Sequence, residues 1–479
     1  MSGGRDADAA AGSRGQAIVQ QLILRAQAAQ ECFASADQET VDGAVTAAGW
    51  AILEPGRNRA LAEQAVRDTG LGNVADKVLK NHRKTLGLLR DLQGARSVGV
   101  LSEDVAAGII EIARPVGIVA AVTPSTNPVA TPANNLINAL KGRNAIILAP
   151  SPKGSAVCAR LLEYVHAQLR KVGAPTDLVQ LLPAPASKAL LAELMRQADL
   201  VVATGSRANV RAAYASGTPA LGVGAGNVAA IVASSANVRL AAERIAASKT
   251  FDNATSCSSE NSLVVMEQVW EPLLAALAEQ GGVLATATEQ ARLQAAMFPG
   301  GMLAPAFIAQ PAPRLARLAG LRRQAYAAAR FVLVQEAAGR VGGGHPFSGE
   351  KLSPVLTLYR VPDFDAAIAQ VKAIYGYQGK GHSVGVHGAS PEEILRLGLE
   401  LPVCRVIVDQ VHCAAVGGAF DNGLPFSLSM GCGTWGGNGF SDNLNYRHFL
   451  NITRIVRSIP IREPAEQDIF AAYWRRHGR

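Results

Sequence analysis

The chain has 479 residues and a formal net charge of +8, and its composition is 49% hydrophobic but only 5% aromatic. This length exceeds what one hydrophobic core supports, so we expect two large domains or more, and the hydrophobic content excludes a disordered protein. No block of Lys and Arg is long enough for a nucleic-acid arm, and no apolar run is long enough to span a bilayer. Neither nucleic acid nor a membrane is therefore expected as a partner. The basic surface instead suits phosphorylated cofactors or an acidic substrate.

The N-terminus and the cysteines indicate the compartment. Residues 1–14 lack an apolar core, so they predict a flexible tail rather than a signal peptide. The six cysteines form no C-x-x-C pair, and their spacing matches neither a metal site nor a disulfide scaffold. We therefore expect reduced thiols in a cytoplasmic protein that holds no metal.

Two kinds of periodicity follow along the chain. Residues 15 to about 95 carry apolar side chains at helical spacing. From about residue 108, continuous apolar strands such as "NAIILAP" and "ADLVVATG" alternate with helices. This alternation predicts an α/β protein with a parallel, doubly wound sheet covered on both faces. A second βα series begins near Cys257, which places a domain boundary near Thr250.

Small residues follow four strands of the first series. They form the segments "TPSTNP" (123–128), "APSPKG" (149–154), "ATGSRANV" (203–210) and "GVGAGN" (222–227). In a parallel sheet such residues let backbone N–H groups approach phosphates beyond the strand ends. Each segment alone indicates no more than a turn, but four together favour a nucleotide site. The ordinary G-x-G-x-x-G fingerprint is absent from the first βα unit.

Cys257 lies in "FDNATSCSSEN", among small polar residues that pack poorly. A structural cysteine usually lies among Leu, Val and Ile, where its thiol is inert. From these residues alone, a small core residue remains the favoured interpretation, and a reactive thiol is the alternative.

Long motifs in a fixed order resolve this choice. "RPVGIVAAVTPSTNP", "SKTFDNATSCSSEN", "EKLSP", "GKGHS" and "SMGCGTWGGN" together resemble the aldehyde dehydrogenase superfamily over residues 105 to 455, and most of all its coenzyme A-acylating branch. The resemblance implies two doubly wound parallel-sheet domains with a catalytic cleft between them. It implies a cofactor-binding domain at 15–250, a catalytic domain at 251–425, and a return to the first domain with an oligomerisation segment at 426–479. A homo-oligomer, dimer or tetramer, is then expected.

The resemblance also implies roles for individual residues. Cys257 aligns with the nucleophile that attacks the aldehyde carbon, and Asn127 with the amide that holds the developing oxyanion. Glu350 matches the acid that binds the nicotinamide ribose, although a solvated loop carboxylate is the alternative. His382 is a candidate base or orienting group for an incoming thiol, although a lone histidine is more often structural. The remaining cofactor-binding candidates are Thr123, Pro124, Ser151, Lys153, Gly205, Ser206, Arg207 and Gly226.

Two departures from the hydrolytic relatives concern the second half of the reaction and the cofactor. Val223 stands where those relatives carry the Glu that activates water, so a thiol, coenzyme A, is expected to take the acyl group. Ala149 replaces a Lys that binds the adenosine ribose, whereas Lys153 and Arg207 could reach a 2′-phosphate. NADP is therefore slightly favoured over NAD. Glu260 is expected to support the Cys257 loop from outside, because a carboxylate facing the thiol would oppose its ionisation.

Within the acylating branch, the chain is most similar to enzymes that act on sulfoacetaldehyde. A sulfonate stays charged near pH 7, so a closed pocket must offer it donors or cations. Lys380 of "GKGHS" is the candidate, with a solvated loop lysine as the alternative. Three other functions stay open: an acylating dehydrogenase of acetaldehyde or propionaldehyde, a non-acylating semialdehyde dehydrogenase, and a non-catalytic nucleotide-binding scaffold.

Overall fold

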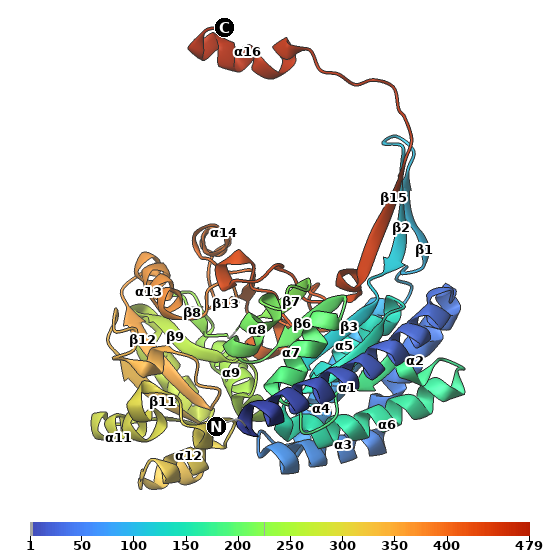
Figure 1. Ribbon diagram of the computed structural model, residues 1–479. Helices are drawn as coiled ribbons and strands as arrows, with labels where there is room; N and C mark the ends of the chain where they lie inside the picture. The colour runs from blue at the N-terminus through green and yellow to red at the C-terminus, as the bar shows by residue number, and fades with distance from the viewer. Residues whose placement is uncertain (1–2, 225) are drawn as a thin grey trace.

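The computed structural model describes residues 3–224 and 226–479, which form two α/β domains and a protruding arm (Figure 1). Four helices come first, and they confirm the helical periodicity of residues 15–95. They are α1 (Gly3–Ala34), α2 (Gln38–Leu53), α3 (Pro55–Thr69) and α4 (Val74–Leu92). Helix α1 begins at Gly3, within the segment predicted to be a flexible tail; residues 1 and 2 of that segment lie outside the described residues.

The first domain is built on a five-stranded parallel sheet with the strand order β5-β4-β3-β6-β7. Its strands are β3 (Ile118–Thr123), β4 (Ala145–Pro150), β5 (Val179–Leu181), β6 (Leu200–Thr204) and β7 (Ala220–Val223). The helices between them are α5 (Ala130–Lys141), α6 (Ser155–Lys171), α7 (Lys188–Gln197) and α8 (Arg207–Tyr214). Strand β3 is buried along its whole length, as a strand with both faces covered must be.

The second domain is built on a seven-stranded parallel sheet with the order β10-β11-β12-β9-β8-β13-β14. Its strands are β8 (Val228–Val232), β9 (Glu260–Met266), β10 (Gly282–Leu284), β11 (Phe331–Glu336), β12 (Val355–Val361), β13 (Val384–His387) and β14 (Val406–Val408). Its helices are α9 (Val238–Thr250), α10 (Trp270–Glu279), α11 (Ala287–Met297), α12 (Ala312–Leu318), α13 (Phe364–Tyr377), α14 (Pro391–Glu400) and α15 (His412–Ala415).

The pairing of β8 corrects the predicted domain boundary. Strand β8 pairs with β9 and β13 of the second sheet, so that sheet begins at Val228 and not after Thr250. A buried apolar strand looks the same in the sequence whichever sheet it joins, and only its neighbours assign it to a domain.

A three-stranded antiparallel sheet forms the arm. It consists of β1 (Gly99–Asp104), β2 (Ile109–Pro115) and β15 (Leu450–Val456), and the chain then runs on to α16 (Glu466–His477), far from both domains (Figure 1). The C-terminal segment thus pairs with a strand that directly precedes the first domain. In the described part of the chain, the helices are all too short or too polar to cross a membrane.

Candidate active site

A cavity of about 320 Å³ lies where α4, the loop after α9, α15 and the segment 427–430 meet. Cys257 and Asn127 both line it, although 130 positions separate them in the sequence. The remaining wall is largely apolar and includes Leu79, Phe251 and Met430. The structure therefore brings the predicted nucleophile and the predicted oxyanion-binding amide to the wall of one cavity.

The turn that leads to Cys257 has an unusual backbone. Asp252, Asn253 and Ala254 have φ values of 50°, 52° and 57°, the left-handed region that residues with a side chain seldom adopt. Each such residue costs roughly 1–3 kcal/mol, so the turn persists only where its surroundings hold it. Strain of this kind directly before a reactive residue points to a position that the fold maintains for function.

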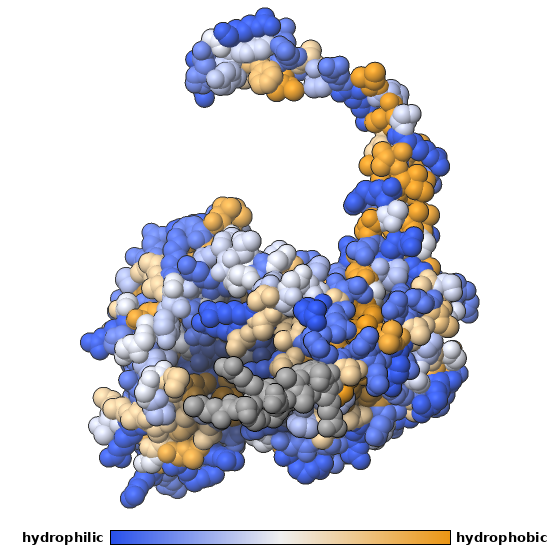
Figure 2. Space-filling model, viewed as in Figure 1, coloured by the Kyte–Doolittle hydropathy of each residue, from blue (hydrophilic) through white to orange (hydrophobic). Residues whose placement is uncertain are grey.

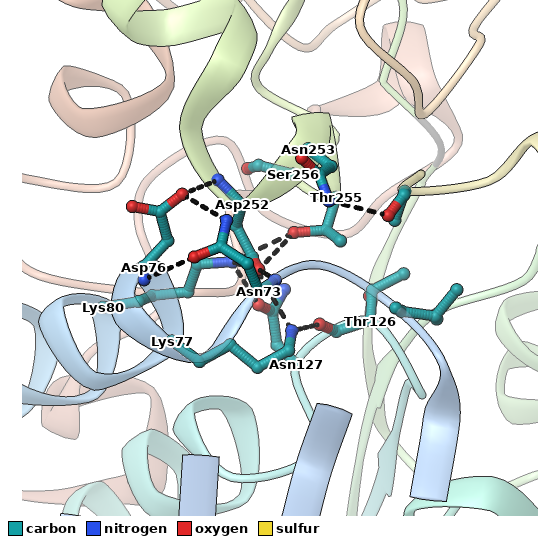
Figure 3. Close-up of polar contacts among 12 residues, drawn as sticks. Asn73, Asp76, Lys77, Lys80, Thr126, Asn127, Asp252, Asn253, Thr255 and Ser256 are labelled. Carbon is teal, nitrogen blue, oxygen red and sulfur yellow. Dashed lines mark hydrogen bonds and ion pairs between the residues drawn. The ribbon is translucent and has the colours of Figure 1, made fainter. Parts of the chain in front are cut away.

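A buried network holds the turn in place (Figure 3). The Asp252 carboxylate is fully buried, and its Oδ2 accepts hydrogen bonds from Lys77 Nζ at 3.0 Å and from Lys80 Nζ at 2.6 Å. Thr255 Oγ1 donates to the same oxygen at 2.6 Å, and the backbone N–H of Asp252 donates to Asp76 Oδ2 at 2.7 Å. Helix α4 is thereby fastened to the turn before Cys257.

The charge balance of the network depends on Asp252. Burial alone would raise the pKa of its carboxyl, but the ammonium groups of Lys80 and Lys77 outweigh burial and lower the pKa below the ordinary value. Burial is also the main reason why the pKa of Lys77 falls to about 8. One ionised carboxylate therefore faces two buried lysines, and it is the acid on which both depend.

Lys80 also orients Asn127. Its Nζ donates to Asn127 Oδ1 at 2.8 Å (Figure 3). An ammonium can only donate, so the contacted atom is the amide oxygen, and the NH₂ group of Asn127 is left as the donor on the cavity wall. This is the orientation that binding of an oxyanion requires.

The sequence analysis missed Lys80 and Asp252. A signal existed, because Lys77 and Lys80 are three positions apart and share one face of a predicted helix. Their burial against an acid 172 residues away could not be read from that spacing.

His382 lies directly beside Cys257. Its Nε2 is 3.6 Å from Cys257 Sγ, and its Nδ1 is 2.8 Å from Ser383 Oγ. The ring is fully buried, and burial, with Arg405 and His412 nearby, lowers the pKa of His382 to about 3. Burial, with the charge of Glu350, raises the pKa of Cys257 to about 12. Both groups are therefore neutral near pH 7 in the ligand-free protein, an S–H group beside an unprotonated imidazole.

Glu260 lies at the start of β9 with its side chain turned toward α9. It is fully buried and accepts a short hydrogen bond from Ser248, and it does not line the cavity. A carboxylate held in this way supports the loop without facing the thiol, as the sequence predicts.

The cofactor candidates of the first domain gather at the carboxyl ends of its strands. Thr123 ends β3, Ser151 follows β4, and the Ser151 N–H donates to the Thr123 carbonyl at 3.0 Å. The Cβ atom of Pro124 lies 3.7 Å from the position that a Cβ atom on Gly205 would occupy. Ser206 is the N-cap residue of α8. Thr123 Oγ1 and Ser151 Oγ are buried and find no hydrogen-bond partner among the described residues. Two unpaired hydroxyls at this edge fit a nucleotide that would pair with them.

A second group of candidates links this edge to Cys257. Burial raises the pKa of Glu350 to about 8, and the charge of Arg207 and a hydrogen bond from the Gly226 N–H offset part of that rise. A side chain on Gly226 would lie 2.1 Å from the Cys257 carbonyl oxygen, so the site requires glycine there. Glu350, Arg207 and Gly226 therefore lie between the strand ends and the cysteine. Lys153 is exposed just after β4, beside Ser151.

Lys380, the predicted partner of the sulfonate, lies away from the cavity with Cys257. It is exposed and does not line that cavity, so the structure gives no support to an anion site there. Its neighbours Gly379 and Gly381 have φ values of 102° and 86°, and this turn directs the loop lysine to solvent while His382 is buried.

Comparison with known proteins identifies the family. A model of the aldehyde dehydrogenase family matches residues 9–294, more than half of the chain. The chain belongs to this family. This aldehyde dehydrogenase is 64% identical over 458 residues to the sulfoacetaldehyde dehydrogenase (acylating) of Cupriavidus necator, across 96% of this chain and 92% of that one. It is 39% identical to the Bilophila wadsworthia protein of the same name, across 96% and 99% of the two chains.

A solved structure agrees with these relatives. The acetylating aldehyde dehydrogenase of Geobacillus thermoglucosidasius matches with a TM-score of 0.90 at 32% identity, across 95% of this chain and 99% of that one. The predicted fold class and the resemblance to the acylating branch are confirmed. The protein is an oxidoreductase of the aldehyde dehydrogenase type.

Proposed function

We propose that this aldehyde dehydrogenase oxidises sulfoacetaldehyde to sulfoacetyl-coenzyme A, reversibly, with a nicotinamide cofactor. The observation that carries the substrate is the 64% identity to the Cupriavidus necator enzyme along nearly the whole chain. The cavity supports the reaction, because it brings a thiol and a correctly oriented amide to one wall.

In the first half of the reaction Cys257 is the nucleophile. The cavity admits the aldehyde to Cys257 Sγ, and His382 Nε2, 3.6 Å away, can accept a hydrogen bond from the S–H group and orient the sulfur for attack. The Asn127 NH₂ group, with its oxygen held by Lys80, and the Cys257 N–H then stabilise the oxyanion of the thiohemiacetal. A nicotinamide cofactor, when bound, supplies the hydride acceptor and a positive charge that favours the thiolate.

In the second half the acyl group on Cys257 passes to coenzyme A. Val223 ends β7 and is 2% exposed, so this position offers no carboxylate to activate water. A thiol therefore takes the acyl group, and the neutral imidazole of His382 is placed to accept a hydrogen bond from the incoming thiol and orient it.

The proposed cofactor is NADP, with NAD as the alternative. Thr123, Ser151, Gly205 and Ser206 would hold the phosphates at the strand ends, and Glu350 would bind the nicotinamide ribose. Lys153 and Arg207 are exposed at the same edge, where they can meet a 2′-phosphate.

The experiment that tests this function measures cofactor reduction with sulfoacetaldehyde, acetaldehyde and propionaldehyde, each with and without coenzyme A. We expect turnover to require coenzyme A and kcat/KM to be at least about tenfold higher for sulfoacetaldehyde, because charge-assisted hydrogen bonds discriminate strongly. Equal efficiency with propionaldehyde would leave a general acylating dehydrogenase. Rapid turnover without coenzyme A would favour the non-acylating alternative, and no turnover with any aldehyde would leave the nucleotide-binding scaffold.

The arm supports a homo-oligomer, a dimer or a tetramer. Figure 2 shows hydrophobic side chains along the arm and the chain beyond it. Val456, at the end of β15, is 70% exposed, and Ile461, which follows the arm, is 90% exposed. An apolar surface of this kind is typical of a protein–protein contact. Light scattering that gave the mass of a single chain would contradict this proposal. The cytoplasmic location inferred from reduced thiols stays a prediction.

A further inference from the structure

We propose that Arg83, on α4, binds the sulfonate of the substrate inside the Cys257 cavity. This inference rests on the function proposed above and deepens it, because it assigns the anion site that Lys380 does not provide. The cavity offers three candidates of the right charge, all on one face of α4: Lys80, Arg83 and Lys84. Their hydrogen bonds decide among them.

Lys80 has no donor left for a substrate. Its ammonium carries three N–H groups, and it donates to Asp252 Oδ2 at 2.6 Å, to Asn127 Oδ1 at 2.8 Å and to Thr255 Oγ1 at 3.1 Å. A sulfonate that bound Lys80 would have to displace the hydrogen bond that orients Asn127. Lys80 therefore serves the oxyanion site and not the sulfonate.

Lys84 is occupied in the same way. Its Nζ donates to the carbonyl oxygens of Gly417 at 2.7 Å, Gly418 at 3.0 Å and Ala414 at 3.4 Å. These bonds fasten α4 to α15 and to the segment that follows it. Burial also lowers the pKa of Lys84 to about 7, so its positive charge is incomplete near neutral pH.

Arg83 is free. Among the described residues, none forms a hydrogen bond or ion pair with its guanidinium, which is half-buried on the cavity wall. A guanidinium keeps its charge at every physiological pH and offers five N–H donors in a planar fork. Two of these can pair with two oxygens of a sulfonate, which itself stays ionised, so the match holds across the working pH range.

The rest of the wall strengthens this assignment. Lys80, Arg83 and Lys84 are the cations among the described residues that line the cavity, and the neighbouring wall includes the apolar residues Leu79, Phe251 and Met430. Asp421, the one acid among the described residues on this wall, is exposed, so water screens its repulsion of an entering anion. A charged group that enters so apolar a cavity needs a partner there, and Arg83 is the cation whose N–H donors have no acceptor among the described residues.

The test compares Arg83→Met with Arg67→Met, a matched control that removes the same charge from an exposed position at the end of α3. Arg83→Met should lower kcat/KM for sulfoacetaldehyde about 100-fold through KM, while kcat/KM for propionaldehyde changes less than about twofold. Arg83→Lys keeps the positive charge but not the planar pair of N–H donors, so it should lower kcat/KM for sulfoacetaldehyde about tenfold. Arg67→Met should match the wild type with both aldehydes. Equal losses with both aldehydes, or no loss with either, would overturn the assignment.

A second measurement does not depend on turnover of sulfoacetaldehyde. Ethanesulfonate should inhibit propionaldehyde oxidation competitively in the wild type, and its inhibition constant should rise at least about tenfold in Arg83→Met but not in Arg67→Met. If the wild type proved indifferent to sulfoacetaldehyde, the proposed substrate would fail, yet selective loss of this inhibition would still place a sulfonate site at Arg83. Inhibition that is unchanged in Arg83→Met would exclude Arg83.

Discussion

Cys257→Ala should reduce aldehyde-dependent cofactor reduction by at least about 10⁴-fold, because the covalent route through the thiohemiacetal is lost. The variant should keep its fold and its affinity for the cofactor, since the side chain lies on a cavity wall and the strained turn before it is held by other residues. Steady-state kinetics, circular dichroism and cofactor titration check the three parts. Cys404→Ala, which changes a half-buried thiol that does not line the cavity, is the control and should retain activity. Substantial activity in Cys257→Ala would remove the nucleophile assignment.

The same cysteine should show a distinctive pH dependence. Because the pKa of Cys257 is raised to about 12 in the ligand-free protein, its thiolate fraction grows about tenfold with each pH unit between 7 and 10. Alkylation of Cys257 by iodoacetamide, followed by peptide mass spectrometry, should rise accordingly without a plateau. Saturating NADP should increase the rate at pH 7.5, since its nicotinamide charge favours the thiolate. A plateau below pH 9 in the ligand-free protein would show that the thiol is already ionised there.

Asp252→Asn should destabilise the protein by about 3–5 kcal/mol and impair catalysis as well, although Asp252 does not line the cavity. The substitution keeps the shape of the side chain but removes the carboxylate that pairs with both of the buried lysines, Lys77 and Lys80. The strained turn then loses its anchor, so Cys257 and Asn127 shift together and kcat falls. Urea unfolding and steady-state kinetics on the same preparation measure both effects.

The double variant Asp252→Asn/Lys80→Met is the control for buried charge. It should recover part of the stability, because one of the two unpaired lysines is gone. It should recover little of kcat, because Asn127 still lacks the hydrogen bond from Lys80 that orients it. In the wild type, the contribution of Asp252 to the free energy of unfolding should also be lost as the pH falls below about 4. The pKa of this acid is lowered in the folded state, and its protonation removes the ion pairs with Lys77 and Lys80. The stability difference between the wild type and Asp252→Asn should therefore shrink in acid. If Asp252→Asn were as stable as the wild type at pH 7, the buried network would contribute nothing to stability.

The order of helices and strands could be predicted because each element carries its own periodicity. The apolar spacing of residues 15–95 predicted the helices, and the continuous apolar runs after residue 108 predicted buried parallel strands. The pattern could not assign β8 to a sheet, because a strand buried on both faces looks the same in either domain. Its hydrogen-bond partners, and hence the domain boundary, are a property of the tertiary structure.

The site divides along the same line. The sequence by itself determined Cys257, Asn127 and His382 as candidates through motifs that resemble the aldehyde dehydrogenases, and the same resemblance placed Val223 where hydrolytic relatives carry a water-activating Glu. Only the tertiary structure decided that the donors of Lys80 and Lys84 are already hydrogen-bonded and that those of Arg83 are not, among the described residues. The partners of these side chains lie far away in the chain, so the local sequence does not reveal them. Asp252 meets Lys80 across 172 residues, and Lys84 meets Gly417 across 333. The sequence singled out Lys380 and not Arg83 as a partner for an anion, and of these two residues only Arg83 lines the folded cavity.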